Sequence, residues 1–172
     1  MNLIDTIRVV EDYPKAGISF KDITTLLQDP QAFRQAIDSL VELAAQYEFD
    51  YVLAAEARGF VLGTPIAYLL NKGFVPVRKP GKLPAEVFHY EYELEYGIDA
   101  LEIHRDAIKP GDKVLIVDDL LATGGTSSAM IKMAEALGAE VAACLYLIEL
   151  NFLPGRDVLA GYEVHSVVKY ED

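Results

Sequence analysis

The sequence predicts an α/β fold with a central, mainly parallel sheet flanked by helices. Apolar segments typical of strands alternate along the chain with segments of helical periodicity. The strand segments are apolar throughout, as in "DYVLAAEARG", "KVLIVDD" and "EVAACLYLIEL". Strands of this kind are buried on both faces, which is the situation of a parallel sheet covered by helices.

The helices are predicted from their apolar spacing and their end signals. "DPQAFRQAIDSLVELAAQY" is amphipathic, with Asp29 as the N-cap and Pro30 at the first helical position. Gly138 is expected to close the helix that opens at residue 125. The remaining helices and short strands are expected at 60–70, 125–138, 74–79 and 163–170.

We expect a single domain over residues 1–172, because this length can bury a substantial core and no repeat or long linker divides it. Residues 80–106 break the alternating pattern and carry turn residues at both ends. They are predicted to form an exposed β-arm, or hood, over the site and to be more mobile than the sheet. A surface hairpin without a catalytic role is the alternative.

Composition and charge limit the partners. The net charge of -12 argues against a general nucleic-acid or anionic-membrane surface. Acidic residues interrupt the N-terminal segment, so no signal peptide is expected, and no segment approaches the ~20 apolar residues of a membrane span. The single cysteine, Cys144, lies in an apolar run and fits a reducing cytosol. A cytoplasmic protein is therefore expected.

Charged residues follow three of the predicted strands. They are Glu56 to Gly59, Arg78 with Lys79, and Asp118 with Asp119. In open α/β sheets, ligands bind beyond the carboxyl ends of the strands. These residues therefore predict a binding site at one edge of the sheet.

The segment "KVLIVDDLLATGGTSSAM" combines two kinds of site. Its Thr-Gly-Gly-Thr turn opens a helix, where free backbone amides and the helix dipole favour an anion. The carboxylates of Asp118 and Asp119 suit sugar hydroxyls or Mg²⁺. A phosphorylated ribose would satisfy both halves. The spacing matches neither a Walker A loop nor a dinucleotide fingerprint, and an ordinary N-capping aspartate is the alternative.

"VLIVDDLLATGGT" resembles the phosphoribosyl-pyrophosphate (PRPP) signature of the type I phosphoribosyltransferases, and "LLATGGT" is typical of the adenine phosphoribosyltransferase branch. Five further segments resemble that branch in the same order: 12–24, 56–60, 77–84, 92–97 and 148–156. The resemblance implies the type I phosphoribosyltransferase fold with its hood, and a homodimer. It also implies a pentosyltransferase of purine salvage that converts adenine and PRPP to AMP and pyrophosphate.

The resemblance also assigns roles to matching residues. Asp118 and Asp119 would hold the ribose hydroxyls and take part in catalysis, with Mg²⁺ held directly or through water or the substrate. The 5′-phosphate would be cradled by Ala122, Thr123, Gly124, Gly125 and Thr126. The pyrophosphate would be held by four bases, some acting across the dimer interface: Arg58, Arg78, Lys79 and Lys82.

The family turn around Arg58 can carry a cis peptide bond, which would be Glu56–Ala57 in this chain. In the hood, Glu95 would assist proton movement at the purine and Tyr96 would close over the site. A surface ion pair for Arg58 and a solvated acidic face for Glu95 are the plain alternatives.

The adenine is expected to contact the segment "AGISFKDI". The resemblance implies that main-chain groups of Ser19 and Lys21 read the purine edge, while Phe20 stacks on one face and Leu150 closes the other. Without the resemblance, Phe20 would be read as a core aromatic.

Three other functions compete with this one. A xanthine or hypoxanthine-guanine phosphoribosyltransferase would need a donor for a 6-oxo group, commonly a lysine, and "CLYLIELNFLPGR" contains none. A PRPP-sensing regulator would need a DNA-binding segment, for which residues 1–28 are too short. A receiver-like signalling domain would lack the Thr-Gly-Gly-Thr turn.

Overall fold

The structure is a computed structural model that describes residues 1–94 and 97–172. The chain divides into two compact units, Met1–Ser39 and Leu40–Asp172. The expectation of one domain over the whole chain is not tested by this division and stays a prediction. No helix in the described part of the chain is long and apolar enough to cross a membrane.

The first unit contains a two-stranded antiparallel sheet and short helical turns. Val10 lies opposite Phe20 in the pairing of its two strands. Its elements are the 3-10 turn η1 (Leu3–Thr6), β1 (Arg8–Glu11), β2 (Ser19–Asp22), α1 (Thr24–Gln28) and the first part of α2 (Pro30–Ala44). Asp29 Oδ1 accepts hydrogen bonds from the N–H groups of Gln31 (2.9 Å) and Ala32 (3.3 Å), which confirms the predicted N-cap of α2.

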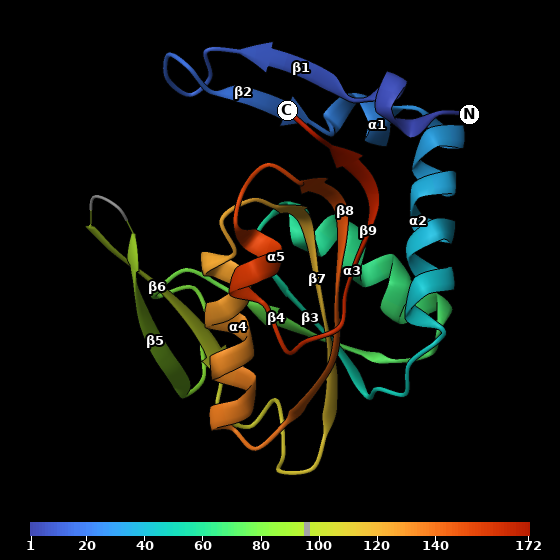
Figure 1. Cartoon of the computed structure of the whole chain (residues 1–172). Coiled ribbons are helices and arrows are strands. Elements are labelled where there is room, and N and C mark those ends of the chain that lie inside the picture. The colour runs from blue at the N-terminus through green and yellow to red at the C-terminus, as the bar shows by residue number, and fades with distance from the viewer. Residues whose placement is uncertain (95–96) are drawn as a thin grey trace. The chain divides into compact units, whose positions relative to one another are not determined.

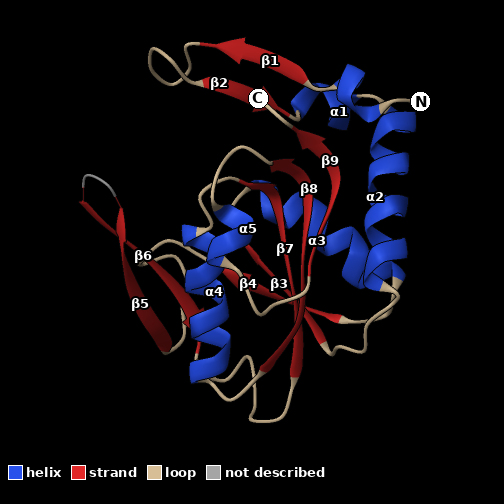
Figure 2. Ribbon diagram, in the orientation of Figure 1, coloured by secondary structure: helices blue, strands red, loops and turns tan. Residues whose placement is uncertain are grey.

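The second unit is built on a five-stranded sheet with the order β4-β3-β7-β8-β9, in which every pair is parallel (Figures 1 and 2). The strands are β3 (Tyr51–Ala55), β4 (Gly73–Val77), β7 (Lys113–Leu121), β8 (Glu140–Leu150) and β9 (Val164–Tyr170). The helices are α3 (Arg58–Leu69), α4 (Gly125–Ala136) and α5 (Gly155–Val158). The predicted parallel α/β fold is confirmed.

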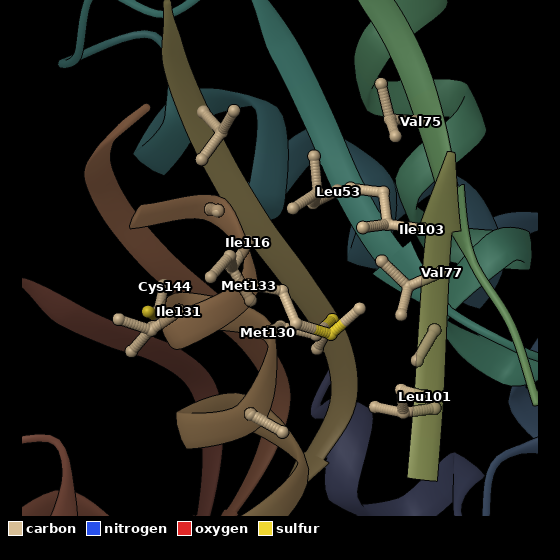
Figure 3. Packing of buried hydrophobic residues seen from close by; sticks show 14 of the residues in the cluster. Leu53, Val75, Val77, Leu101, Ile103, Ile116, Met130, Ile131, Met133 and Cys144 are labelled. Atoms are coloured by element: carbon tan, nitrogen blue, oxygen red, sulfur yellow. The ribbon is translucent and has the colours of Figure 1, made fainter. Parts of the chain in front are cut away.

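Helices α3 and α4 cover opposite faces of this sheet. On β3, a Cβ on Gly63 of α3 would meet Ala54 and Val52 at 3.2 Å, so the even-numbered side chains face α3. Leu53 belongs instead to the apolar cluster that contains Met130 of α4 (Figure 3). The same strand thus buries both faces, which explains its continuous apolar sequence.

The predicted β-arm is an antiparallel hairpin of β5 (Val87–Leu94) and β6 (Gly97–His104). The hairpin is less exposed than expected, because Leu101 and Ile103 lie in the same core cluster as Val77 (Figure 3). Period-2 alternation places these two apolar side chains on one face of β6, and that face packs on the core. The base of the hairpin is therefore part of the hydrophobic core.

Strand β7 also runs further than predicted. The apolar pattern suggested an end at Asp119, but the strand continues through Leu121, with Leu120 opposite Ile148 and Leu121 opposite Glu149 of β8. The two aspartates consequently lie inside a paired strand. Pairing with β8 fixes the backbone from which their side chains project.

Candidate active site

A hollow of about 230 Å³ opens where β7 leads into α4. It brings together most of the residues that were predicted to bind the phosphorylated ribose. Its lining consists of Arg58, Asp118, Asp119, Leu120, Leu121, Ala122, Thr123, Gly124, Gly125, Thr126 and Ser127. The predicted anion cradle and the predicted carboxylate pair therefore form one concave site.

The cradle depends on the backbone of Gly124, which has φ +87°, a left-handed conformation that suits glycine. A Cβ at this position would lie 3.1 Å from the Val158 Cβ and 3.2 Å from the Gly155 carbonyl oxygen. The Gly155 N–H donates to the Ala122 carbonyl at 3.0 Å. Helix α5 therefore supports the loop from behind, while the N–H groups of the first turn of α4 can meet an anion.

Beneath the cradle, a buried tyrosine holds the first turn of α4. The Tyr146 hydroxyl donates to Ser127 Oγ at 2.5 Å, and both residues are buried. Burial raises the pKa of Tyr146 well above its ordinary value, so the hydroxyl remains a neutral donor. This support was not predicted, because Tyr146 sits in an apolar strand run that indicated only core packing.

The two aspartates differ in their surroundings. Asp119 is 7% exposed, whereas Asp118 is half-buried and its Oδ1 accepts from the Asp119 N–H at 2.8 Å. Burial, together with the charge of Asp119, raises the pKa of Asp118 well above its ordinary value. A Cβ on Gly59 would come within 3.2 Å of Asp118 Oδ1, so the glycine at the start of α3 leaves room for this carboxylate.

Arg58, the first residue of α3, reaches the second aspartate. Its Nε donates to Asp119 Oδ2 at 2.6 Å, while 52% of its side chain is exposed. The Glu56–Ala57 peptide bond that precedes it is cis, as predicted. Arg58 thus joins the turn after β3 to the carboxylates of β7.

The basic turn after β4 is close to the same edge of the sheet but is tied to carboxylates. Its three bases, Arg78, Lys79 and Lys82, do not line the hollow. Glu56 Oε1 accepts from Arg78 Nε at 3.1 Å and from the Lys79 N–H at 2.9 Å, and the latter bond lowers the pKa of Glu56. Lys79 Nζ donates to Asp99 of the hairpin at 2.7 Å. The exposed Lys82 follows in the same turn.

An ion pair between a buried glutamate and an exposed arginine holds the end of β8. Glu149 is 2% exposed and receives two bonds from Arg156, at 2.9 Å from Nε and 2.8 Å from Nη2, and a third from Ser166 Oγ at 2.7 Å. The Arg156 guanidinium holds the pKa of Glu149 below its ordinary value. The sequence carried a signal for this pair, since an acid inside "LYLIEL" must find a partner when the strand is buried.

The residues predicted to contact adenine fall in both units. Ser19, Phe20 and Lys21 are on β2, where the Phe20 ring packs edge-on against Tyr13 at 5.2 Å. Ser19 and Lys21 are two residues apart, so their backbone groups point to the same edge of the strand. Leu150 ends β8 and is half-buried. Their role in binding stays a prediction, and Glu95 and Tyr96 lie outside the described residues.

The fold and the hollow together define a ligand site of the kind that α/β proteins form beyond the carboxyl ends of their parallel strands, and comparison with known proteins identifies the family. The family model "Phosphoribosyl transferase domain" matches residues 22–166, so the chain belongs to the phosphoribosyltransferase family. It is 59% identical over 170 residues to the adenine phosphoribosyltransferase of Alkaliphilus metalliredigens, covering 99% of this chain and 100% of that protein.

Solved structures agree. The adenine phosphoribosyltransferase of Thermoanaerobacter pseudethanolicus has a TM-score of 0.94 and 55% identity, with 96% of each chain covered. The enzyme of Saccharomyces cerevisiae, crystallised with adenine and an imino-altritol bisphosphate, has a TM-score of 0.89 and 38% identity, again over 96% of each chain. These similarities extend over nearly the whole length of the chain.

Proposed function

We propose that this enzyme transfers the 5-phosphoribosyl group of PRPP to adenine and releases AMP and pyrophosphate, a pentosyltransferase reaction of purine salvage. The observation that carries the proposal is the hollow that unites a backbone anion cradle with Asp118 and Asp119. The relatives that this chain matches over nearly its full length are named adenine phosphoribosyltransferases, which supports adenine as the acceptor.

In the proposed reaction, N9 of adenine forms a bond to the anomeric carbon while the bond from that carbon to the pyrophosphate oxygen breaks, with inversion. Negative charge grows on the leaving group, and the ribose becomes oxocarbenium-like. Catalysis then requires fixed positions for both substrates, cations near the leaving group and exclusion of water. The N9 proton must be lost, and Glu95 is the proposed acceptor.

The described residues distribute these tasks over the site. The cradle of residues 122–126 would hold the 5′-phosphate, and Asp118 with Asp119 would accept hydrogen bonds from the ribose hydroxyls. Arg58 would stabilise the leaving pyrophosphate from its place beside Asp119. Arg78, Lys79 and Lys82 would add positive charge at the neighbouring strand end, partly across a dimer interface, and Tyr96 would close over the site.

Mg²⁺ is part of the proposal. Among the residues that the structure describes, no cluster of three or more His, Cys, Asp or Glu side chains could hold a metal alone. Mg²⁺ commonly keeps several waters and is bound by one or two carboxylates together with substrate phosphates, which fits Asp118 and Asp119. When bound, it would neutralise part of the charge on the pyrophosphate.

Adenine recognition is proposed for Ser19, Phe20, Lys21 and Leu150. Backbone groups of Ser19 and Lys21 share one edge of β2 and can both donate to and accept from a 6-aminopurine. The segment 144–156 has no lysine to serve a 6-oxo group. Both features favour adenine over guanine, hypoxanthine or xanthine.

We also propose a cytoplasmic homodimer. The outer side of α3 exposes Val61, Tyr68 and Leu69, which recur at the spacing of one helix face. A second copy of the chain is the proposed cover. Sedimentation of the wild type should give a dimer, and Tyr68→Glu with Leu69→Glu should shift it toward a monomer; a wild-type monomer would reject this part of the proposal.

The experiment that tests the function is pyrophosphate release from PRPP with adenine, guanine, hypoxanthine or xanthine, each with and without Mg²⁺. Turnover with adenine that needs Mg²⁺ is the expected result. Turnover with a 6-oxopurine instead would identify a different purine phosphoribosyltransferase. Binding of PRPP without turnover of any base would indicate a PRPP-sensing protein.

A further inference from the structure

The hairpin contributes an acidic residue that joins two parts of the molecule. Asp99 of β6 accepts from Lys79 Nζ at 2.7 Å and from the hydroxyl of Tyr92 at 3.3 Å, both at Oδ2. Tyr92 is its direct partner across the hairpin. One oxygen of Asp99 therefore binds both the Lys79 ammonium of the basic turn and the Tyr92 hydroxyl of β5.

Tyr92 reaches from the same hairpin to the anion cradle. Its ring is half-buried, and a Cβ on Gly125 would lie 3.9 Å from the Tyr92 Cε2. Its hydroxyl also interacts with the Thr126 side chain in the first turn of α4. Burial raises the pKa of Tyr92, so the hydroxyl stays neutral and can donate to Asp99.

These contacts form one path between the two ends of the site. It runs from Thr126 in the cradle through Tyr92 and Asp99 to Lys79, whose N–H is bonded to Glu56 beside the Arg58 turn. The cradle and the basic turn follow different strands, and the hairpin connects their side chains.

We propose that Tyr92 and Asp99 are positioning residues. They hold the phosphate cradle and the basic turn at the separation that a substrate with phosphate groups at both ends requires. This inference rests on the proposed function, because PRPP carries a 5′-phosphate and a pyrophosphate on one ribose. Neither residue acts as a proton carrier. Their role is to keep the Thr126 hydroxyl and the Lys79 ammonium at a set separation.

The test compares Tyr92→Phe and Asp99→Asn with Tyr90→Phe. Tyr90 is the matched control because it lies two residues earlier on the same face of β5 and outside this path. Each test variant should raise the KM for PRPP about three- to tenfold, the effect of one lost hydrogen bond. The KM for adenine and kcat should change less than about twofold, since the path from Thr126 to Lys79 touches neither the base nor the reacting carbon.

The double variant separates positioning from direct contact. Asp99 is an anion and cannot itself bind a phosphate, so a loss in Asp99→Asn must act through its partners. If the path works as one unit, the double variant Tyr92→Phe with Asp99→Asn raises the KM for PRPP no more than the single variant with the larger effect. Fully multiplicative effects would overturn the proposal.

Calorimetric titration with PRPP and with ribose 5-phosphate provides a readout without turnover. Tyr92→Phe should weaken the binding of PRPP more than that of ribose 5-phosphate, which has only the 5′-phosphate, whereas Tyr90→Phe should change neither. Wild-type affinity of Tyr92→Phe for PRPP, or equal losses for PRPP, ribose 5-phosphate and adenine with a lower melting temperature, would overturn the inference. A wild-type chain that neither binds ribose 5-phosphate nor turns over PRPP would instead overturn the proposed function, and this inference with it.

Discussion

Arg58 Nε and Asp119 Oδ2 lie 2.6 Å apart, so the cation proposed for the leaving group and a carboxylate proposed for the ribose form one ion pair. The aspartate is nearly buried, while the arginine is half-exposed at the mouth of the hollow. The pair places positive charge beside two carboxylates that would otherwise repel each other. Any substitution of Arg58 should therefore affect both the binding of pyrophosphate and the position of Asp119, which is proposed to bind the ribose.

Arg58→Ala is expected to slow pyrophosphorolysis of AMP by about ten- to a hundredfold, because hydrogen bonds to charged groups contribute about 1.5–3 kcal/mol. Initial rates with AMP and pyrophosphate measure the effect. Arg58→Lys, which keeps the charge but not the planar donor group, should recover part of the rate. Unchanged pyrophosphorolysis in Arg58→Ala would show that Arg58 serves only as a structural partner of Asp119.

Asp118→Asn combined with Asp119→Asn should abolish PRPP turnover and leave the fold intact. Burial and the neighbouring charge raise the pKa of Asp118, which means that the charged pair is unfavourable in the folded protein. Relief of this repulsion should offset the loss of the Arg58–Asp119 ion pair, so the free energy of unfolding should change by less than about 1 kcal/mol. Pyrophosphate release and urea unfolding measure the two effects; turnover at the wild-type rate would reject the site.

Gly124→Ala and Gly125→Ala should differ in stability although they are neighbours. Gly124 has φ +87° and contacts at 3.1 Å, so an alanine there should cost about 1–2 kcal/mol or more and displace the cradle. At Gly125, which begins α4, an added Cβ meets only Tyr92, at 3.9 Å, and stability should be unchanged or rise by up to about 1 kcal/mol. Equal unfolding free energies for the two variants would contradict this account of the loop.

Arg156→Ala should lower the free energy of unfolding by about 1.5–3 kcal/mol, because it removes the charged partner of the buried Glu149. Arg105→Ala is the matched control, since its pair with Glu86 is exposed and 3.4 Å long, and it should cost less than about 1 kcal/mol. Urea unfolding of both variants measures the difference. Similar losses would show that burial of Glu149 does not determine the cost.

The stabilisation that charged Asp22 gives the folded protein should be lost in acid. The N–H and then the hydroxyl of Thr24, followed by Arg8, lower the pKa of Asp22 from 3.8 to about 2. Since the folded-state pKa is the lower one, the stabilisation is present above about pH 4 and is lost as the pH falls through about 2. Asp22→Asn should be less stable than the wild type near pH 6, and the gap should close toward about pH 2. A gap that does not depend on pH would reject this linkage.

Local pattern was sufficient for the strands of the parallel sheet, for its longer helices and for the cradle. Residues 122–126 follow one another in the chain, so a single strand–turn–helix segment assembles them. The short elements of the first unit and helix α5 were not predicted. The predicted cap of α2 is of the same local kind, because it depends on residues only a few positions apart. The cis bond before Ala57 was expected from the resemblance to the family and not from local pattern.

The sequence by itself thus determined the fold class, the anion cradle and the family to which the chain belongs. Only the tertiary structure decided which distant side chains meet: Arg58 with Asp119, Tyr146 with Ser127, and Tyr92 with Asp99 and the cradle. The physical reason is that strand order and register set these contacts, and both depend on how the whole core packs. The pattern along one strand records which faces are buried but not which side chain lies opposite.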